Sequence, residues 1–302
     1  MTIQGVYSVL PTPFDPAGAL DLASLRRVVE RFLQAGVNGF TALGVTGEVA
    51  RLTGAERLEV LDAVVQQVAG RVPVVAGATA GGSHGAIDYA RQAQAAGCAA
   101  VMVSPPRLNK LNSAAVVAHF QALATAVDLP IVVQDYPPIS GYAMEPELLA
   151  RIVREAPAAQ TIKLEDPPTP RKIAALRRLC GDGVRIFGGL GGTFLLEELL
   201  AGCDGAMTGF AYPEILLAIT QAFHQGRQDR AADVFYRYVP LMRFEFQEGI
   251  GVAIRKEVLR RRGLLAHATV RPPGPQLDTG TAAQLDRLLT WLQQTYREDA
   301  WI

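Results

Sequence analysis

Lys163 is the side chain in this sequence best placed to do covalent chemistry. It ends the apolar run 158–162 and is followed at once by the turn-forming stretch 164–168. The run predicts a buried strand with the lysine at its mouth. Burial disfavours an ammonium and so favours the neutral amine, which can attack a carbonyl carbon and form a Schiff base. The alternative is a lysine whose stem packs while its ammonium reaches water, and this stretch by itself favours neither.

Two kinds of segment alternate along the first 226 residues. Short apolar runs, most of them bounded by Gly or Pro, predict strands at 6–10, 37–43, 72–77, 98–103, 129–134, 158–163, 184–187 and 204–208. Helical patterns lie between them, at about 22–35, 54–70, 83–96, 113–126, 145–155, 169–180, 191–201 and 213–225. Strands that are apolar throughout indicate parallel strands buried on both faces. Eight strands alternating with eight helices therefore predict an α/β protein with a (βα)8 TIM barrel over residues 1–226.

After about residue 226 the pattern changes to helices alone. They are expected at roughly 228–247, 249–262 and 281–296. Residues 227–302 are therefore predicted to form a C-terminal helical extension of the barrel, and such extensions more often support packing and assembly than chemistry.

Composition narrows the class of protein. Of the 302 residues 49% are hydrophobic, which supports a sizeable core, and Lys+Arg 29 balances Asp+Glu 29. This neutrality argues against nucleic acid or an anionic membrane as partner. Cys98, Cys180 and Cys203 lie in or beside apolar runs and are interpreted as core thiols in a reducing compartment. Residues 1–5 carry no signal-peptide pattern and no run approaches the ~18 apolar residues of a membrane span, so we expect a cytoplasmic protein.

The carboxyl ends of the strands carry the active site in a barrel of this type. The segments predicted to lie there are 44–48, 104–107, 134–138, 163, 188–192 and 208–209. They offer one amine, one phenol, several hydroxyls and many backbone amides. The four histidines, His84, His119, His224 and His267, show no ligand spacing. We therefore expect neither a metal site nor a cofactor.

Three side chains could share one face with Lys163. Residues 134 and 136 lie on the same face of an extended strand, so Gln134 and Tyr136 could both point toward the amine. Tyr136 is a candidate acid or base, although a tyrosine beside two prolines is commonly a packing residue. Glu165, two residues beyond Lys163, is a candidate base or simply the ion partner of the lysine.

Other polar residues at this end invite different interpretations. Gly47 and the glycine-rich stretch 188–192 could bind an anion through backbone amides, but their spacing fits neither a P-loop nor a dinucleotide fingerprint. We therefore expect a small carboxylate or a hydroxylated chain as ligand. Arg107 could hold the distal carboxylate of a sugar diacid, or be solvated surface. Asp135 should point away from the barrel interior, and Glu48 is expected to cap the loop before the second helix.

Several motifs occur in an order and spacing that resemble a known superfamily. They are 10–14, 44–48 followed by 52–53 and 56–57, the Lys163 strand, and 255–259. Together they resemble the dihydrodipicolinate synthase / N-acetylneuraminate lyase superfamily, from about residue 4 to residue 295. The resemblance implies a (βα)8 barrel with a helical C-terminal extension and a homotetramer or homodimer. It also implies class I lyase chemistry, in which Lys163 condenses with a 2-oxo acid such as pyruvate.

The sequence departs from the synthase pattern at four places. Val45 replaces the first of two adjacent hydroxyl residues, which leaves Thr46 to bind the keto-acid carboxylate. Pro106 and Arg107 replace paired tyrosines. An ungapped match puts Gln134 at the proton-donating tyrosine, and Ile139 at the arginine that holds a second substrate carboxylate. Condensation with aspartate semialdehyde would therefore lack both proton transfer and an anchor.

Three other segments, 134–141, 163–165 and 205–209, look more like the sugar-acid branch, which includes 2-keto-3-deoxy-pentonate dehydratases. In that branch the Schiff base acidifies C3 and assists loss of a hydroxyl, or it assists retro-aldol cleavage. The predicted catalytic residues are Lys163, Tyr136 and Glu165. The predicted substrate-binding residues are Thr46, Gly47, Gln134, Gly188 and Thr208.

Three alternatives remain open on the sequence. The first is 4-hydroxy-tetrahydrodipicolinate synthase itself. The second is a non-catalytic barrel that binds a keto acid, and the third is a metal-dependent aldolase.

Overall fold

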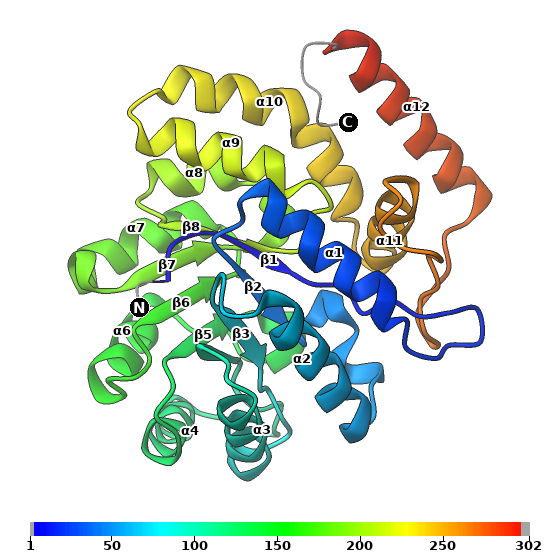
Figure 1. The fold of residues 1–302 in the computed structure, drawn as a ribbon. Coiled ribbons are helices and arrows are strands. Elements are labelled where there is room, and N and C mark those ends of the chain that lie inside the picture. The colour runs from blue at the N-terminus through cyan, green and yellow to red at the C-terminus, as the bar shows by residue number, and fades with distance from the viewer. Residues whose placement is uncertain (1–2, 297–302) are drawn as a thin grey trace.

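Eight parallel strands close into a barrel at the centre of the molecule, in a computed structural model that describes residues 3–296 (Figure 1). The strands are β1 (Gly5–Val9), β2 (Gly39–Ala42), β3 (Val74–Gly77), β4 (Ala100–Val103), β5 (Ile131–Asp135), β6 (Thr161–Leu164), β7 (Arg185–Gly188) and β8 (Gly205–Thr208). Each pairs with the next in sequence, and β8 pairs with β1. The predicted TIM barrel is confirmed.

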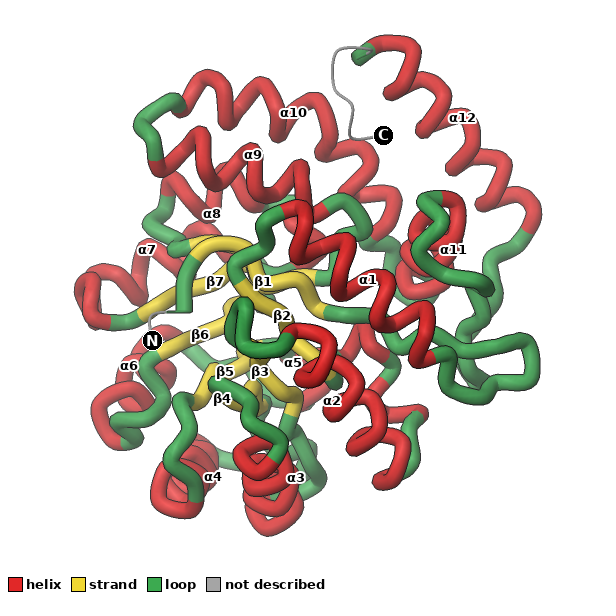
Figure 2. Tube along the Cα trace, viewed as in Figure 1, coloured by secondary structure: helices red, strands yellow, loops and turns green. Residues whose placement is uncertain are grey.

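Helices alternate with the strands around the outside of the barrel (Figure 2). They are α1 (Leu22–Ala35), α2 (Gly54–Val68), α3 (Ser83–Ala95), α4 (Ser113–Ala126), the short α5 (Pro137–Ser140), α6 (Pro146–Glu155), α7 (Thr169–Cys180), α8 (Leu195–Leu200) and α9 (Pro213–His224). Local signals set their ends. Asp21 accepts a hydrogen bond from the Ser24 N–H to start α1, and Gly36 ends it in the left-handed conformation that glycine adopts without strain.

The predicted helix 191–201 is wrong at its start, because α8 begins only at Leu195. Leu190–Gly192 instead form a 3-10 turn, η4, in which Gly191 and Gly192 have positive φ. Glycines in that conformation interrupt a right-handed helix. The turn lies at the carboxyl end of β7, where it shapes the wall of a cavity described below.

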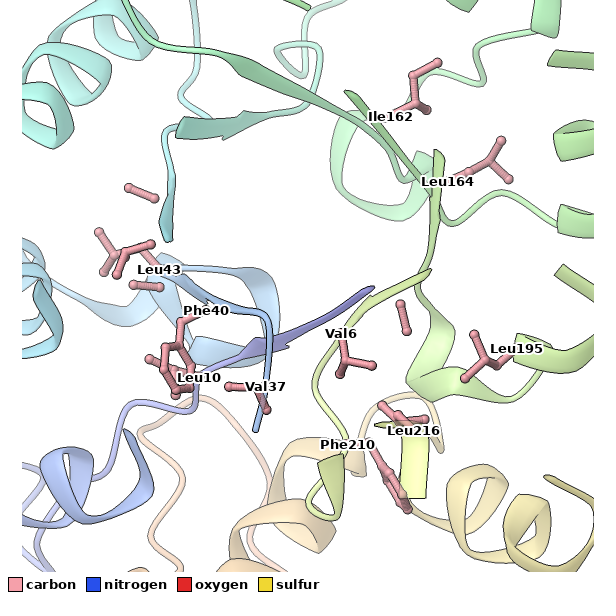
Figure 3. Packing of buried hydrophobic residues seen from close by; sticks show 14 of the residues in the cluster. Val6, Leu10, Val37, Phe40, Leu43, Ile162, Leu164, Leu195, Phe210 and Leu216 are labelled. Atoms are coloured by element: carbon pink, nitrogen blue, oxygen red, sulfur yellow. The ribbon is translucent and has the colours of Figure 1, made fainter. Parts of the chain in front are cut away.

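The strands are buried on both faces, as the apolar runs predict. Alternate residues point into the barrel, where Tyr7 and Phe187 pack edge to face with ring centroids 5.6 Å apart. The other residues point outward into the layer between strands and helices, part of which Figure 3 shows around Val6, Ile162 and Leu164. Parallel strands packed in this way hold the side chains at their carboxyl ends in a rigid ring.

The three cysteines differ in burial. Cys98 and Cys203 are buried, as predicted. Cys180 is partly exposed, because it is the last residue of α7, so its assignment as a core thiol is wrong. All three are free thiols. Within residues 3–296, no helix combines the length and apolar character that crossing a membrane requires.

Three further helices follow α9, in good agreement with the prediction. They are α10 (Gln228–Glu245), α11 (Gly251–Arg261) and α12 (Thr279–Thr295). Helix α10 packs along α9 and also contacts η4, and α11 and α12 pack against α10. The division into a barrel of residues 1–226 and an extension of 227–302 stays a prediction, since residues 1–2 and 297–302 lie outside the described part of the chain.

Glu48 joins the barrel to these helices instead of capping α2. A capping box of Thr53 and Glu56 starts α2, so the expected capping role of Glu48 is wrong. Its buried carboxylate pairs with Lys256 of α11 and accepts a hydrogen bond from the Arg271 N–H at 3.0 Å. Burial lowers the pKa of Lys256 to about 8, and the Glu48 charge opposes that shift. Removing Glu48 would leave the Lys256 ammonium buried without its carboxylate partner, whereas Glu48 also pairs with Arg51 at 2.8 Å.

Candidate active site

A buried lysine–glutamate pair lies at the carboxyl end of the barrel. The Lys163 Nζ is 2.9 Å from Oε2 of Glu165, and both residues are less than 10% exposed. Gln134 stands opposite Lys163 in the register of β5 and β6, and its Nε2 donates to the same carboxylate oxygen at 2.8 Å. On the next strand, the Ser104 Oγ donates to Oε1 of Gln134 at 3.2 Å. The predicted face that carries Gln134, Lys163 and Glu165 is therefore present, and the lysine is paired instead of reaching water.

The geometry supports proton transfer from the amine. A carboxylate at hydrogen-bond distance can take the proton that a lysine must lose before it attacks a carbonyl. The Gln134 amide holds the orientation of that carboxylate, and Ser104 holds the amide. Sequence analysis predicted Gln134 but not its support by Ser104.

Tyr136 lies on the edge of the same site. It directly follows β5, is half-buried, and lines a cavity of about 610 Å³ together with Glu165. Burial raises the pKa of the Tyr136 phenol, and the negative charges of Glu165 and Glu248 raise it further. The phenol therefore keeps its proton at neutral pH and can act as a proton donor.

Helix α10 and the segment after it form the outer wall of this cavity. Their contribution consists of Val239, Arg243, Phe246 and Glu248. The remaining wall comes from the loops after β5, β6 and β7, and its other members are Pro137, Pro138, Asp166, Pro167, Leu190, Thr193 and Phe194. We expected the C-terminal helices to serve packing more than the site. No local pattern in residues 228–247 revealed this role, because it arises when α10 packs back over η4.

The predicted carboxylate-binding residues lie on the rim formed by β2 and β8. Thr46 and Gly47 belong to the 3-10 turn η1 (Val45–Gly47) that follows β2. The hydroxyl of Thr46 accepts a hydrogen bond from Arg255 at 3.3 Å. Thr208 ends β8, and its Oγ1 accepts from the Gly191 N–H at 2.9 Å.

Gly188 is held on the outer side of the barrel wall. Its N–H donates to the Cys203 Sγ at 3.2 Å, and a side chain at this position would overlap the Glu198 carboxyl group. Its amide is therefore engaged away from the predicted substrate.

Asp135 points outward, as expected. There it pairs with Lys172, which sequence analysis missed and which links the ends of β5 and β6. The Lys172 Nζ is 2.5 Å from Oδ2 of Asp135 and 2.9 Å from Oδ2 of Asp166. Burial raises the pKa of Asp135 to about 6, and the Lys172 charge opposes that shift. Because Asp135 precedes Tyr136 and Asp166 follows Glu165, the ammonium fixes the two segments that carry the site.

The sequence of this chain matches that of a known protein family. Residues 2–292 match the Dihydrodipicolinate synthetase family. The chain belongs to this family. Members of the family are lyases that work through a Schiff base, and the superfamily resemblance of the motifs is confirmed.

Relatives named for two different reactions are about equally similar to this chain. An L-2-keto-3-deoxyarabonate dehydratase of Azospirillum brasilense is 33% identical over 286 residues, which cover 93% of this chain and 92% of the relative. A 4-hydroxy-tetrahydrodipicolinate synthase of Methylococcus capsulatus is 32% identical over 298 residues, with 98% and 96% covered. The crystal structure of dihydrodipicolinate synthase from Rhodopseudomonas palustris matches with a TM-score of 0.90 at 34% identity, covering 95% of this chain and 97% of that chain.

Sequence analysis also suggested Arg107 as a ligand for a distal carboxylate, and it found no residue spacing typical of a metal site. Arg107 is exposed and is not part of the cavity wall, whereas Arg243 of α10 is. Within residues 3–296, no three His, Cys, Asp or Glu side chains are grouped so that they could hold a metal ion.

Gly189 makes room for the Glu165 carboxylate. It directly follows β7, and a Cβ built on it would overlap the Glu165 side chain. Position 189 is therefore a glycine because the Glu165 side chain packs too closely for any Cβ.

We predict that Gly189→Ala lowers the free energy of unfolding by about 1–3 kcal/mol, because the added methyl group overpacks the site. Gly183→Ala is the matched control, since a Cβ there meets nothing within 4 Å. Urea unfolding curves measure both. In a double-mutant cycle, Glu165→Ala should relieve part of the Gly189→Ala loss. A Gly189→Ala protein as stable as the Gly183→Ala protein would contradict the packing argument.

Proposed function

We propose that this chain is a class I lyase that acts on a 2-keto-3-deoxy sugar acid through a Schiff base on Lys163. The observation that carries the proposal is the buried Lys163 amine, 2.9 Å from the carboxylate of Glu165, a residue that lines a cavity of about 610 Å³. Membership of a Schiff-base lyase family supports the same chemistry.

In the first step the amine becomes the nucleophile. Glu165 takes a proton from the Lys163 ammonium, and the neutral amine attacks C2 of the 2-oxo acid. The carbonyl oxygen leaves as water after it has gained two protons, and a protonated Schiff base remains. Gln134 keeps the carboxylate oriented through this exchange.

In the second step the protonated Schiff base acts as an electron sink. It acidifies C3, so that a base can remove a C3 proton and the hydroxyl on C4 can leave as water after it is protonated. In the cleavage variant, a base takes the proton of the C4 hydroxyl, the bond between C3 and C4 breaks, C4 leaves as an aldehyde, and an enamine of pyruvate remains that is then protonated on C3. In either variant water hydrolyses the Schiff base and frees Lys163. Glu165 is assigned as the base, and the protonated phenol of Tyr136 as the proton donor to the leaving oxygen.

The substrate carboxylate is assigned to the rim of the barrel opposite these groups. Thr46 can donate its hydroxyl hydrogen because its oxygen already accepts from Arg255. The Gly47 amide lies in the same turn.

A sugar-acid substrate is favoured over aspartate semialdehyde by the residues that this chain lacks. Val45 and Gln134 stand where the synthase pattern has proton-transfer groups, and Ile139 stands where it has an arginine. The dehydratase relative named for L-2-keto-3-deoxyarabonate supports this choice. Relatives named 4-hydroxy-tetrahydrodipicolinate synthase, at 30% to 35% identity over most of the chain, keep that reaction as the second candidate. Homo-oligomeric assembly and a cytoplasmic location stay predictions.

A substrate panel tests the proposal directly. We expect purified protein to convert one or more 2-keto-3-deoxy pentonates or hexonates, with semialdehyde formation reporting dehydration and pyruvate release reporting cleavage. Pyruvate with aspartate semialdehyde should condense poorly in a coupled reductase assay. Efficient condensation would move the assignment to the synthase. Tight binding with no turnover would indicate a keto-acid-binding barrel, and loss of activity with a chelator would indicate a metal-dependent aldolase.

We predict that Lys163→Ala abolishes turnover and leaves the fold intact, because no neighbouring group can replace the covalent catalyst. Lys163→Arg is the matched variant, since it keeps a cation beside Glu165 while a guanidinium does not form the Schiff base. Borohydride trapping followed by mass spectrometry should find a pyruvate adduct on the wild-type chain and on neither variant. Retained turnover in a folded Lys163→Ala protein would falsify the class I assignment.

We further predict that Tyr136 and Thr46 act in different steps. Tyr136→Phe should slow the chemical step about 10²–10⁴-fold, as expected for loss of a general acid. Thr46→Ala should mainly weaken substrate binding, by about 10- to 100-fold. Single-turnover kinetics separate the two effects. Tyr142→Phe is the control, because the Tyr142 hydroxyl contacts Ser113 and lies outside the cavity wall. A nearly silent Tyr136→Phe would make Tyr136 a packing residue.

A further inference from the structure

Arg255 brings a buried guanidinium from α11 to the carboxyl end of the barrel. The residue is 2% exposed. Its Nη1 donates to the Thr46 hydroxyl at 3.3 Å, and its Nη2 donates to the Val9 carbonyl at 2.5 Å. The arginine therefore connects the C-terminal helices to β1 and to the turn after β2.

The backbone at the end of β8 is shaped to admit this contact. A Cβ built on Gly209 would overlap both Nη1 of Arg255 and Oγ1 of Thr46. The guanidinium, the hydroxyl and the end of β8 thus meet at one point. Any larger residue at position 209 would separate Arg255 from Thr46.

The positive charge of Arg255 is only partly compensated. Its one nearby carboxyl group among the described residues is Glu245, whose Oε1 lies 3.8 Å from the Arg255 Nε, too far for a hydrogen bond. That Nε is buried and has no hydrogen-bond partner within residues 3–296. The Glu245 carboxyl group accepts instead from the Ala211 N–H.

Burial acts on both members of this pair. It raises the pKa of Glu245 to about 8 and lowers the pKa of Arg255 to about 10, and each charge opposes the shift of the other. Among the described residues, the Arg255 guanidinium beside Thr46 makes no hydrogen bond to a carboxylate, so an anion bound at this rim could pair with it.

We infer that Arg255 is a positioning residue for the substrate carboxylate: through its hydrogen bond it orients the Thr46 hydroxyl toward that carboxylate. By accepting from Arg255, the Thr46 oxygen leaves its own hydrogen free to be donated to a carboxylate oxygen. The inference rests on the proposed function, because it concerns the C1 carboxylate of the 2-oxo acid that condenses with Lys163.

A pair of ketones that differ only in the carboxylate tests the inference. Pyruvate carries the carboxylate, and hydroxyacetone has a hydroxymethyl group in its place. For each ketone, borohydride trapping and intact-protein mass spectrometry give the concentration that half-saturates the Lys163 adduct. The proteins compared are wild type, Arg255→Met, Arg255→Lys, Thr46→Ala and the double variant of Thr46→Ala with Arg255→Met. Arg262→Met is the matched control, because that arginine binds Glu214 and the Ala211 carbonyl and lies over the ring of Tyr212.

We expect Arg255→Met to raise the half-saturating pyruvate concentration about 10- to 100-fold, the loss typical of a hydrogen bond that involves a charged group. Trapping of hydroxyacetone should stay unchanged. Arg255→Lys should fall between wild type and Arg255→Met, and the double variant should be little worse than Thr46→Ala, because Arg255 acts through Thr46. Arg262→Met should leave both ketones unaffected.

Two outcomes overturn the inference while the proposed function stands. One is an equal loss of pyruvate and hydroxyacetone adducts in Arg255→Met, and the other is no loss of either. A wild-type protein that forms no pyruvate adduct overturns the proposed function and this inference together. Arg255→Met leaves Glu245 without its cation and so could fail to fold. In that case the double variant of Glu245→Gln with Arg255→Met, which also removes the carboxyl group, replaces it in the comparison of the two ketones.

Discussion

The contact between the Lys163 amine and the Glu165 carboxylate is the constraint around which the site is built. A charge buried at the end of a strand is costly unless an opposite charge accompanies it. Here the partner of the ammonium is also a group that can accept its proton, so in the proposed reaction the contact that keeps the lysine inside the barrel also prepares it for attack. Gln134 of β5 then holds the carboxylate, and Ser104, directly after β4, holds the Gln134 amide. Gly189 leaves the space that the Glu165 side chain occupies.

The C-terminal helices complete a site that the barrel only begins. Helix α10 forms one wall of the cavity, and Arg255 of α11 reaches the Thr46 turn. The buried pair of Glu48 and Lys256 ties α11 to the same end of the barrel. A charged group inserted from a packed helix loses little conformational freedom when a ligand arrives, so binding is preorganised. In the proposed reaction the barrel supplies the covalent chemistry, and these helices set the surroundings in which the substrate is held.

The same scaffold is shared by relatives named as dehydratases and as synthases, which shows that the barrel itself does not decide the substrate. What distinguishes this chain is the chemistry lining the site. Gln134 holds a carboxylate instead of carrying a proton, and Tyr136 stands two residues later at the edge of the cavity. Under the proposed function, such substitutions leave the Schiff-base step in place and change how protons reach the rest of the substrate.

The sequence by itself determined the barrel, the order of its elements and the strand end that carries Lys163, because apolar runs and helical periodicity report burial directly. It also placed Gln134, Lys163 and Glu165 on one face, since alternation along a strand is a local property. It missed Ser104 as a support, the Lys172 clamp, the cavity wall of α10 and the contact between Arg255 and Thr46. Each of these joins residues from different elements, up to 209 positions apart. It also misplaced the start of α8 and the role of Glu48. Only tertiary structure decided these features, because packing between elements, and not the pattern within one, sets which distant side chains meet.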